Sequence, residues 1–357
     1  MRKDQGAGLL SRRREEVSMT AQDMASPSRM HDHHTDQPVL ELESVTRSYG
    51  TRDRRRVVVD GLTMRVHAGS VVCLLGPNGA GKTTTIKMAS TLLLPDSGSV
   101  RICGIDAIAD PYRGEKHLSL LLGGERGFYL RASAIDNLRF FAQLAGVSHR
   151  DVEPRIRESL EAVGLEDKAD ARVETFSRGM KQRLHIARAM CSHASLVLLD
   201  EPTTGLDPHS ALRIRELIAD MRRGGAGIVL TTHAMAEAEA LADRIHVIRE
   251  GRIIVSGSVR DLADSVRLDG VSMYMAFESE WNPDAANRLR GIPGVRGVNA
   301  DLRGGVWSIT VTWQGAHEPD AELIRQAAAS PELRHLGWRP ASLEEVYLAV
   351  LDAGREG

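Results

Sequence analysis

The sequence predicts an α/β domain built on a mostly parallel core sheet, between a polar N-terminal tail and a small α+β C-terminal domain. Three apolar runs have the length and composition of buried parallel strands, at 71–75, 195–199 and 227–232. Between the first two of these runs lie helical stretches, at 133–145, 153–163 and 179–191. Alternation of this kind is typical of parallel sheets, because each connection must cross back over the sheet.

The segments outside this central part differ from it in composition. Residues 1–37 are polar, show no periodicity and are predicted to be a disordered tail. All four tryptophans lie beyond Gly257, where we expect the order β-α-β-β-α-β and a last helix that starts at a capping box, Ser342 to Glu345. This order is typical of a ferredoxin-like module. We therefore predict three parts, at 1–37, 38–257 and 258–357.

Composition places the chain among ordinary globular proteins. It has 357 residues, 42% hydrophobic and 26% charged, and its net charge of -2 provides no overall basic field for nucleic acid. Its cysteines, Cys73, Cys103 and Cys191, form no C-x-x-C pair, which indicates buried thiols in a reducing compartment. No apolar run approaches the roughly 18 residues that span a bilayer. We therefore expect a soluble protein, or one held at a membrane by a partner.

A glycine-rich motif follows the first apolar run. The stretch GPNGAGKTT matches G-x-x-x-x-G-K-[ST], and a chance match is rare because only six of the 46 basic residues are Lys. The glycines allow backbone N–H groups to surround phosphate oxygens at the start of a helix. Lys82 is expected to reach the β- and γ-phosphates, and the Thr83 hydroxyl to bind Mg²⁺. The predicted phosphate-binding residues are Gly76, Asn78, Gly79, Gly81, Lys82, Thr83 and Thr84.

Two further motifs end apolar strands with groups that suit hydrolysis of a phosphate chain. In LVLLDEP, Asp200 is expected to contact Mg²⁺ and Glu201 to polarise an attacking water. An acidic strand end that caps a helix is the alternative. In VLTTHAMAEAE, His233 lies at the carboxyl end of a strand, where open α/β sheets bind ligands, and is expected to contact the γ-phosphate. Such a histidine alone is more often structural, but beside the other two motifs we favour a functional one.

The order of these motifs resembles that of the nucleotide-binding subunit of an ABC transporter. After the phosphate loop come FSRGM at 176–180, LLDEP at 198–202, GLD at 205–207 and then His233. The resemblance covers residues 39–257, and ASLEEVYLAVL at 341–351 is similar to the tail of drug-exporter subunits of the ABC-2 type. It implies a P-loop ABC ATPase domain with a helical subdomain, ATP and Mg²⁺ as cofactors, and ATP hydrolysis coupled to transport across a membrane.

The resemblance also implies roles and partners. Tyr49 matches the aromatic residue that stacks on adenine, with a core tyrosine as the alternative. Ser177 and Gly179 match the signature that holds the ATP of a partner subunit, and Asp207 matches the loop that touches that subunit. One phosphate loop and one signature imply a homodimer or a dimer with a paralogue. The resemblance further implies a separate integral membrane permease and a peripheral position at the cytoplasmic face of the cell membrane.

The chain departs from the family pattern in two places. Where the family has Gln ahead of the segment that contacts the membrane partner, this sequence has Gly124 followed by Glu125. Whether Glu125 replaces the Gln is left open. The signature has Arg178 and Met180 where its commonest form has Gly and Gln. The next two cations, Lys181 and Arg183, are expected to be solvated on the surface of a helix.

Two clusters of side chains also leave alternatives open. Four of the five phenylalanines are Phe128, Phe140, Phe141 and Phe176, and we expect them to form a groove for a helix of the membrane subunit or to pack in the core. The His31–His34 stretch is a weak metal site or, as we prefer, part of a polar tail in which no fold holds the ligands.

Together these features predict the ATP-hydrolysing subunit of an exporter, with drug, antibiotic or lipid-like substrates by resemblance. A soluble ABC-type ATPase acting on DNA or ribosomes is the alternative. It is disfavoured because residues 258–357 carry ten Arg against 15 acidic residues, a net charge of -5, so we expect no nucleic acid partner. A pseudo-ATPase is a third reading, which the acidic pair and His233 argue against. The C-terminal part is expected to regulate the ATPase, support dimerisation, dock a partner or add structure only.

Overall fold

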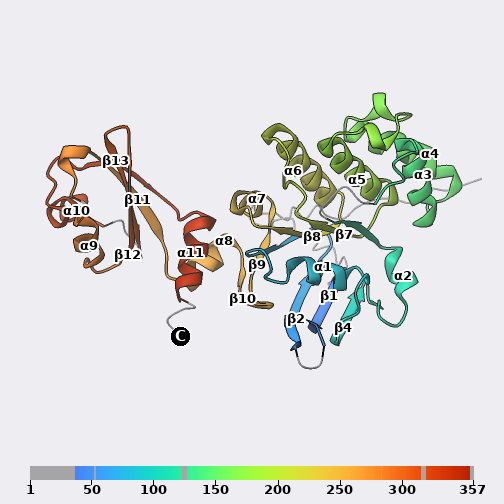
Figure 1. The fold of residues 1–357 in the computed structure, drawn as a ribbon, viewed down its shortest axis with the longest axis horizontal. Helices are drawn as coiled ribbons and strands as arrows, with labels where there is room; N and C mark the ends of the chain where they lie inside the picture. Colours follow the sequence, from blue (N-terminus) through green and yellow to red (C-terminus); the bar gives the residue numbers. More distant parts are fainter. Residues whose placement is uncertain (1–36, 52–53, 123–126, 283, 315–318, 354–357) are drawn as a thin grey trace, which may run out of the picture. The chain divides into compact units, whose positions relative to one another are not determined.

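The computed structural model describes residues 37–51, 54–122, 127–282, 284–314 and 319–353 (Figure 1). Within these ranges the chain forms three sheets, two of them in the main domain. Apart from Gln37, the predicted tail with its histidine stretch lies outside the described residues, as do Gly124 and Glu125. None of the helices in the described ranges is long and apolar enough to cross a bilayer.

A six-stranded sheet forms the centre of the main domain. Its strand order is β10 (Arg252–Gly257), β9 (Arg244–Arg249), β3 (Val71–Leu75), β8 (Gly227–Thr232), β7 (Leu196–Asp200) and β6 (Leu118–Leu121). Neighbouring strands are parallel except β10, which pairs antiparallel with β9 at the edge. Every residue of β3, β7 and β8 is buried, as expected for parallel strands covered on both faces. The three strands predicted from apolar runs are confirmed, the second of them one residue later than expected.

A second, antiparallel sheet packs with one face of the first. Its order is β2 (Arg56–Val66), β1 (Leu40–Tyr49), β4 (Ser97–Ile102) and β5 (Ile105–Asp106), and the short helix α2 (Pro111–Glu115) follows it. Helix α1 (Lys82–Ala89) packs with both sheets, because its Ile86 and Met88 share a buried cluster with Leu42 of β1 and Leu74 of β3. The residues that begin α1 are therefore held next to the carboxyl end of β3.

Helices cover the other face of the central sheet, above the strands in Figure 1. They are α3 (Ala134–Leu144), α4 (His149–Ala162), α5 (Arg178–Ser192), α6 (Pro208–Arg223) and α7 (Met235–Leu241). Their apolar side chains share a second buried cluster with Leu75 and Leu199 of the sheet. Ser133, Ser177 and Asp207 each cap a helix by accepting a hydrogen bond from the N–H three residues on.

Helices α3, α4 and α5 form the helical subdomain that the resemblance implied. Leu138, Ile156 and Leu184, one from each helix, are fully buried where the three helices meet. Helix α4 begins four residues before the predicted start at 153. The reason is that Ser148 adopts the extended backbone of an N-cap, so the helix already starts at His149.

The C-terminal module has the predicted ferredoxin-like order. Its antiparallel sheet runs β12 (Val295–Arg303), β13 (Val306–Trp313), β11 (Gly270–Phe277) and β14 (Arg334–Arg339), and its helices are α9 (Ala285–Arg290) and α10 (Ala321–Ala328). Tyr274 and Ile309 of the sheet share a buried cluster with Leu289 of α9 and Ile324 of α10. The predicted fold class, a main α/β domain with a small α+β addition, is confirmed.

Two helices that flank this module belong to the core of the main domain. They are α8 (Val259–Ser265) and α11 (Leu343–Ala353). Leu262 of α8 and Leu343 and Val346 of α11 are fully buried in the same cluster as Leu241 of α7. The chain therefore leaves the core of the main domain after α8 and returns to it at α11. The division at residue 257 stays a prediction.

Candidate active site at the carboxyl edge of the central sheet

The loop between β3 and α1 has the geometry of a phosphate cradle. A Cβ at Gly76 would lie 2.4 Å from the backbone oxygen of Ile248, and a Cβ at Gly81 would lie 2.6 Å from that of Val58. Gly81 also has a φ of 107°, which glycine adopts without strain. Gly81 precedes α1 without a side-chain cap. The first N–H groups of α1 are therefore available to an anion.

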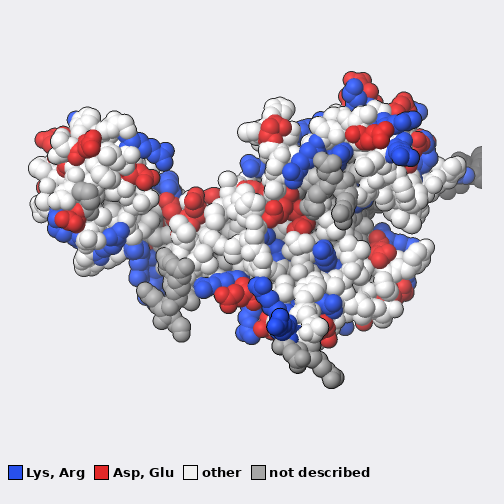
Figure 2. Space-filling model, viewed as in Figure 1, with Lys and Arg blue, Asp and Glu red and all other residues white. Residues whose placement is uncertain are grey.

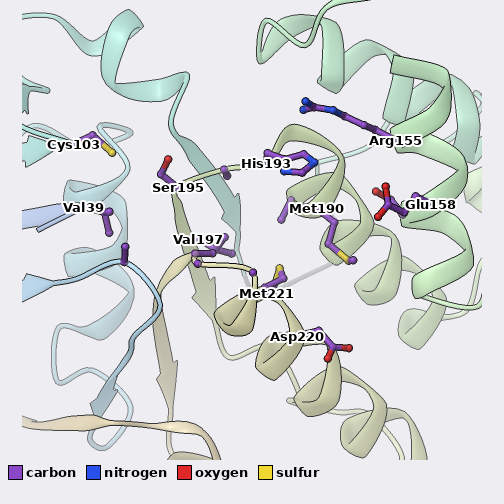
Figure 3. Close-up of a pocket in the computed structure, with 17 residues that line it drawn as sticks. Val39, Cys103, Arg155, Glu158, Met190, His193, Ser195, Val197, Asp220 and Met221 are labelled. Carbon is purple, nitrogen blue, oxygen red and sulfur yellow. The ribbon is translucent and has the colours of Figure 1, made fainter. Parts of the chain in front are cut away.

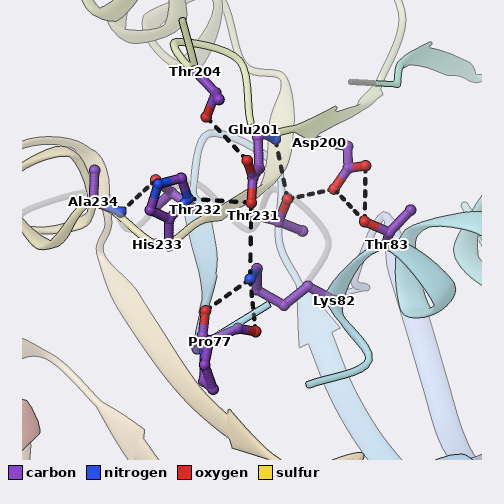
Figure 4. Close-up of polar contacts among 11 residues, drawn as sticks. Pro77, Lys82, Thr83, Asp200, Glu201, Thr204, Thr231, Thr232, His233 and Ala234 are labelled. Carbon is purple, nitrogen blue, oxygen red and sulfur yellow. Dashed lines mark hydrogen bonds and ion pairs between the residues drawn. The ribbon is translucent and has the colours of Figure 1, made fainter. Parts of the chain in front are cut away.

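Lys82, the first residue of α1, folds back onto this loop (Figure 4). Its Nζ donates to the backbone oxygens of Gly76 at 2.7 Å and Pro77 at 3.1 Å, and lies 3.9 Å from Oε1 of Glu201. The residue is only 5% exposed. Burial lowers the pKa of the ammonium group, against the opposite effect of Glu201 and Asp200. A buried cation beside open N–H groups suits a polyphosphate chain.

Asp200 and Thr83 bring hard oxygen atoms together beside the loop. The Thr83 hydroxyl donates to the carboxylate of Asp200, 3.0 Å from Oδ2, and the Thr231 hydroxyl donates to Oδ1 at 2.6 Å. Hydroxyl and carboxylate oxygens are ligands that Mg²⁺ prefers, so the residues fit this ion. Among the described residues there is no group of three His, Cys, Asp or Glu that could hold a metal. Mg²⁺ would therefore take its other ligands from phosphate oxygens and water.

Glu201 turns away from the line of β7 through a left-handed backbone conformation, with a φ of 51°. This conformation costs a non-glycine residue roughly 1–2 kcal/mol. Hydrogen bonds support it, because the Glu201 N–H donates to the backbone oxygen of Thr231 at 3.0 Å and the Thr204 hydroxyl donates to Oε2 at 3.0 Å. Its Oε1 lies 3.2 Å from Nδ1 of His233 (Figure 4). The carboxylate is therefore held between His233 and Lys82.

Neighbouring strand ends explain why these groups meet. Strands β3, β8 and β7 are parallel neighbours, so the loop after β3, His233 after β8 and Asp200 at the end of β7 lie at one edge of the sheet. Hydrogen bonds and ion pairs, in part through Thr231, connect five of the predicted residues in one network, namely Lys82, Thr83, Asp200, Glu201 and His233. Their catalytic and metal-binding roles remain predictions.

The signature residues form a second group, at the starts of α5 and α6. The Ser177 hydroxyl caps α5 by accepting a hydrogen bond from the N–H of Met180 at 3.2 Å. A Cβ at Gly179 would lie 3.1 Å from Oγ of Ser210 in α6. Asp207 caps α6 by accepting from the N–H of Ser210 at 3.0 Å, and hydrogen bonds from Ser210 lower the pKa of its carboxyl. The structure thus brings Ser177, Gly179 and Asp207 to neighbouring helix starts.

Tyr49 lies at the end of β1 with 43% of its surface exposed. The guanidinium carbon of Arg47 lies 5.4 Å from the centre of its ring. An aromatic ring exposed to this extent is available for stacking on a base. The alternative of a core tyrosine is therefore disfavoured, and stacking on adenine remains a prediction.

The expectation of solvated cations is wrong for Lys181, while Arg183 is half-buried and bound to backbone oxygens. Lys181 is only 8% exposed. Nη1 of Arg183 donates to the backbone oxygens of Val163 at 2.9 Å and Gly164 at 3.1 Å, which follow the end of α4. Cations commonly satisfy the carbonyl groups that a helix leaves unpaired at its C-terminus. Arg183 therefore connects α5 to α4.

Sequence reasoning missed two residues that support the site. The Thr231 hydroxyl holds Asp200, and Nε2 of Gln182 donates to the backbone oxygen of Pro202 at 2.6 Å, which links α5 to the loop after β7. Thr231 and Thr232 directly precede His233 in the sequence. Because β8 and β7 are neighbours, a hydroxyl at the end of β8 could have been expected to lie beside Asp200 at the end of β7. The sequence held no comparable signal for Gln182, whose partner is 20 residues away.

A cavity of about 450 Å³ lies away from this site (Figure 3). Ser195 and Val197 line it at the amino end of β7, together with Met190 and His193 at the end of α5. Asp200 lies at the opposite end of β7. The cavity is therefore not part of the candidate phosphate site.

Comparisons with known proteins agree with these observations. The profile of the ABC transporter family matches residues 59–204. The ABC transporter ATP-binding protein NatA of Bacillus subtilis is 36% identical over 223 residues, which are 62% of this chain and 91% of that protein. The Nod factor export ATP-binding protein I of Cupriavidus pinatubonensis is 36% identical over 319 residues, 89% of this chain and 91% of that protein. The chain therefore belongs to the family of ABC transporter ATP-binding proteins.

A drug-resistance relative and solved structures refine this assignment. The daunorubicin/doxorubicin resistance ATP-binding protein DrrA of Streptomyces peucetius is 33% identical over 312 residues, 87% of this chain and 92% of that protein. A solved ATP-binding subunit of an ABC transporter, 30% identical, superposes with a TM-score of 0.58 over 64% of this chain and 92% of that one. The dimeric ATP-binding cassette MJ0796, solved with ADP and Pi, is 23% identical and superposes with a TM-score of 0.56. The match covers 61% of this chain and 98% of that one, and supports the fold. The resemblance to ABC-2 exporter subunits is confirmed, and the chain is an ABC ATPase.

Proposed function

We propose that the chain hydrolyses ATP at this site to drive a separate membrane permease that exports drug-like, antibiotic or lipid-like compounds. One observation carries the proposal: Lys82, Asp200 and Glu201 converge on the loop after β3, with His233 beside them. Relatives named for Nod factor export and for daunorubicin and doxorubicin resistance support the direction of transport. Both align over the C-terminal region as well as the ATPase domain, since they cover 89% and 87% of the chain.

The loop and α1 would hold the phosphate chain of ATP. Lys82 would contact the β- and γ-phosphates together with the uncapped N–H groups of α1. Thr83 and Asp200 would hold Mg²⁺, which when bound neutralises charge on the phosphate oxygens. The exposed ring of Tyr49 would stack on the adenine.

Glu201 would accept a proton from the attacking water. A general base must lie within hydrogen-bonding distance of the proton that it takes, and the left-handed turn directs this carboxylate into the site. Thr204 holds Oε2, while Oε1 faces His233 and Lys82. The side chain of His233 is 51% exposed, so its imidazole is accessible to the γ-phosphate.

The second group of residues would serve the ATP of a partner subunit. Ser177 and Gly179 would contact its γ-phosphate, and Asp207 would touch the partner near its phosphate loop. The partner is a second copy or a paralogue, related by a two-fold axis. Because ATP would be contacted from both sides, it would favour the closed dimer, and hydrolysis would release it. The solved cassette MJ0796 is a dimer, which supports this arrangement.

The permease is expected to contact an exposed apolar surface around α3. Leu144 is 64% exposed and Phe140 is 43% exposed on that helix, and Tyr129 just ahead of it is 58% exposed. The rings of Tyr129 and Phe140 meet edge to face with 5.2 Å between their centres. Neighbouring exposed apolar side chains mark partner surfaces. Phe176, in contrast, is 4% exposed and packs in the core.

This contact would hold the chain at the cytoplasmic face of the membrane as a peripheral protein.

The surface charge supports a protein partner rather than nucleic acid. Acidic and basic side chains are intermixed over the face shown in Figure 2, and the net charge of the chain is -2. A nucleic acid partner would instead favour a continuous basic surface.

Mg²⁺-dependent ATP hydrolysis by the purified chain tests the proposal. We expect turnover by the wild type, and an ATP affinity about 10- to 140-fold weaker in Lys82→Ala, because a charge-assisted contact of about 1.5–3 kcal/mol is lost. Lys87→Ala, in the last turn of the same helix, is the matched control and should bind ATP like the wild type. ATP binding without hydrolysis in the wild type, or full affinity in Lys82→Ala, would contradict the proposal.

A further inference from the structure

We propose that helix α11 positions His233, so that the ferredoxin-like module controls the rate of ATP hydrolysis through this helix. The proposal rests on the role of His233 in the proposed function. The route runs from the sheet of the module, through the ion pair of Arg339 and Glu345, to α11 and then to α7.

Helix α11 is part of the core of the main domain, although the module separates the two in sequence. Leu343, Val346 and Tyr347 are at most 7% exposed. They share a buried cluster with Ala238 and Leu241 of α7, and α11 packs directly against α7 and α8. Full burial of an apolar side chain contributes about 1.5–3 kcal/mol. Helix α11 is therefore held firmly against α7.

His233 lies in the short connection between the end of β8 and the start of α7, so both elements position it. The helix starts at Met235, and the residue before it, Ala234, provides no side-chain cap. The Ala234 N–H donates to the hydroxyl of Thr232 at 3.0 Å. With seven residues, α7 is too short to be stable alone, so its neighbours set its position. Because His233 directly follows β8 and one residue separates it from α7, the strand fixes one side of this connection and the packing of α7 fixes the other.

An ion pair connects α11 to the sheet of the module. Arg339, the last residue of β14, donates from Nη1 to Oε2 of Glu345 at 2.8 Å and from Nη2 to Oε1 at 2.7 Å. The backbone N–H and the hydroxyl of Ser342 also donate to Oε2, each at 2.8 Å. Burial alone would raise the pKa of Glu345, but Arg339 and Ser342 outweigh it and hold this pKa below its usual range. The pair is therefore charged at neutral pH, and its two-point geometry fixes direction as well as distance.

Arg339 joins the sheet of the module to α11. It pairs with Val271 of β11, the inner strand beside β14. Glu345, and to a smaller extent Glu239 of α7, raise the pKa of its guanidinium group. A shift of the sheet would therefore act on α11 through this ion pair. Because α11 is packed against α7, the shift would also reach α7 and the imidazole of His233.

Substitution of Arg339 tests this route. Arg339→Ala should lower kcat about tenfold and leave KM for ATP within about twofold, because a displaced catalytic group costs rate rather than binding. Arg339→Lys keeps the charge and should recover at least about a third of the wild-type kcat, since one contact to Glu345 is retained. Arg303→Ala, at an 88% exposed side chain of the same module, is the matched control and should keep the wild-type kcat.

Two further measurements distinguish a displaced His233 from a partly unfolded protein, and from a failure of the proposed function itself. Rates are taken per folded molecule, with the folded fraction measured by circular dichroism. His233→Ala, assayed in parallel, should abolish hydrolysis, and normal hydrolysis there would overturn the proposed role of His233. An inactive His233→Ala together with a wild-type kcat in Arg339→Ala would overturn the α11 proposal alone. The α11 proposal would also be overturned if the unfolded fraction of Arg339→Ala accounts for its whole loss of activity. A change in KM for ATP with an unchanged kcat would overturn it as well.

Discussion

Oε1 of Glu201 lies 3.2 Å from Nδ1 of His233, where β7 and β8 end side by side. The same oxygen lies 3.9 Å from Nζ of Lys82. The proposed base, the proposed γ-phosphate contact and the phosphate-loop lysine therefore form one polar unit. Because truncation of one member can disturb the others, substitutions that keep the shape of the side chain complement the alanine variants of Lys82 and His233.

Asp200→Asn should change the Mg²⁺ dependence of hydrolysis. The substitution keeps an oxygen for the hydroxyls of Thr83 and Thr231, but it removes the negative charge that a hard cation prefers. We expect the Mg²⁺ concentration for half-maximal rate to rise at least about tenfold, a loss of about 1.4 kcal/mol. Titration of Mg²⁺ at saturating ATP measures this. Asp220→Asn on α6 is the exposed control, and an unchanged Mg²⁺ dependence in Asp200→Asn would contradict the assignment.

Gly179→Ala should separate folding from dimer formation. The new Cβ would lie 3.1 Å from Oγ of Ser210, a contact that a small shift of this hydroxyl relieves, and alanine favours a helix more than glycine. We therefore expect a thermal unfolding midpoint close to that of the wild type. Because Gly179 is a proposed contact of the partner's γ-phosphate, a side chain added at this position should abolish ATP-dependent dimerisation. Light scattering with and without ATP measures it, with Ser192→Ala at the other end of α5 as control, and an ATP-dependent dimer in Gly179→Ala would refute the prediction.

The chain should lose stability as the pH falls below about 6.5, the ordinary pKa of histidine. His185 is 4% exposed and lies against the ring of Phe128, with 4.2 Å between the ring centres. Burial, and then the charge of Arg188, lower the pKa of His185 to about 3, and burial lowers that of His246 to about 4. Between these values and 6.5 the unfolded chain binds more protons than the folded one. Stability is therefore full above pH 6.5 and falls with decreasing pH, by up to about 1.4 kcal/mol per pH unit for each histidine.

Urea unfolding at pH 7.5 and pH 5.5 tests this dependence. His185→Leu removes one of the two titrating groups, so the difference in unfolding free energy between the two pH values should shrink. His67→Gln, at an exposed position, should show the wild-type difference. The same difference in His185→Leu as in the wild type would show that His185 does not stay neutral in the folded chain.

Most of the site could be predicted because its residues directly follow strands that the sequence shows as apolar runs. The phosphate loop is a single turn after an apolar run, and Asp200 and His233 each end another such run. Parallel strands with apolar composition on both faces bring their carboxyl ends together, so pattern alone placed these residues at one edge. The ferredoxin-like order was predictable for the same reason, since each of its elements has its own periodicity.

Contacts between distant segments were not predictable from pattern. Arg183 looked like a surface cation, yet it satisfies carbonyl oxygens after α4, because α4 and α5 are neighbours. A Cβ at Gly205 would lie 2.4 Å from Nη1 of Arg178, so this glycine leaves room for the arginine that replaces the usual signature glycine. The return of α11 to α7 depends in the same way on which apolar faces meet. Helical periodicity shows that a face is buried, but not against which partner.

Hydrolysis and dimerisation of Glu201→Gln, measured on the same sample, test the central claim most directly. The amide keeps an oxygen for the Thr204 hydroxyl but takes up no proton. We predict turnover at least about 100-fold lower, the loss expected for a general base, with ATP affinity close to that of the wild type and a dimer that persists in ATP and Mg²⁺. Turnover within about threefold of the wild type would be too small a loss for a general base and would contradict the assignment of Glu201 as the base of this ATPase.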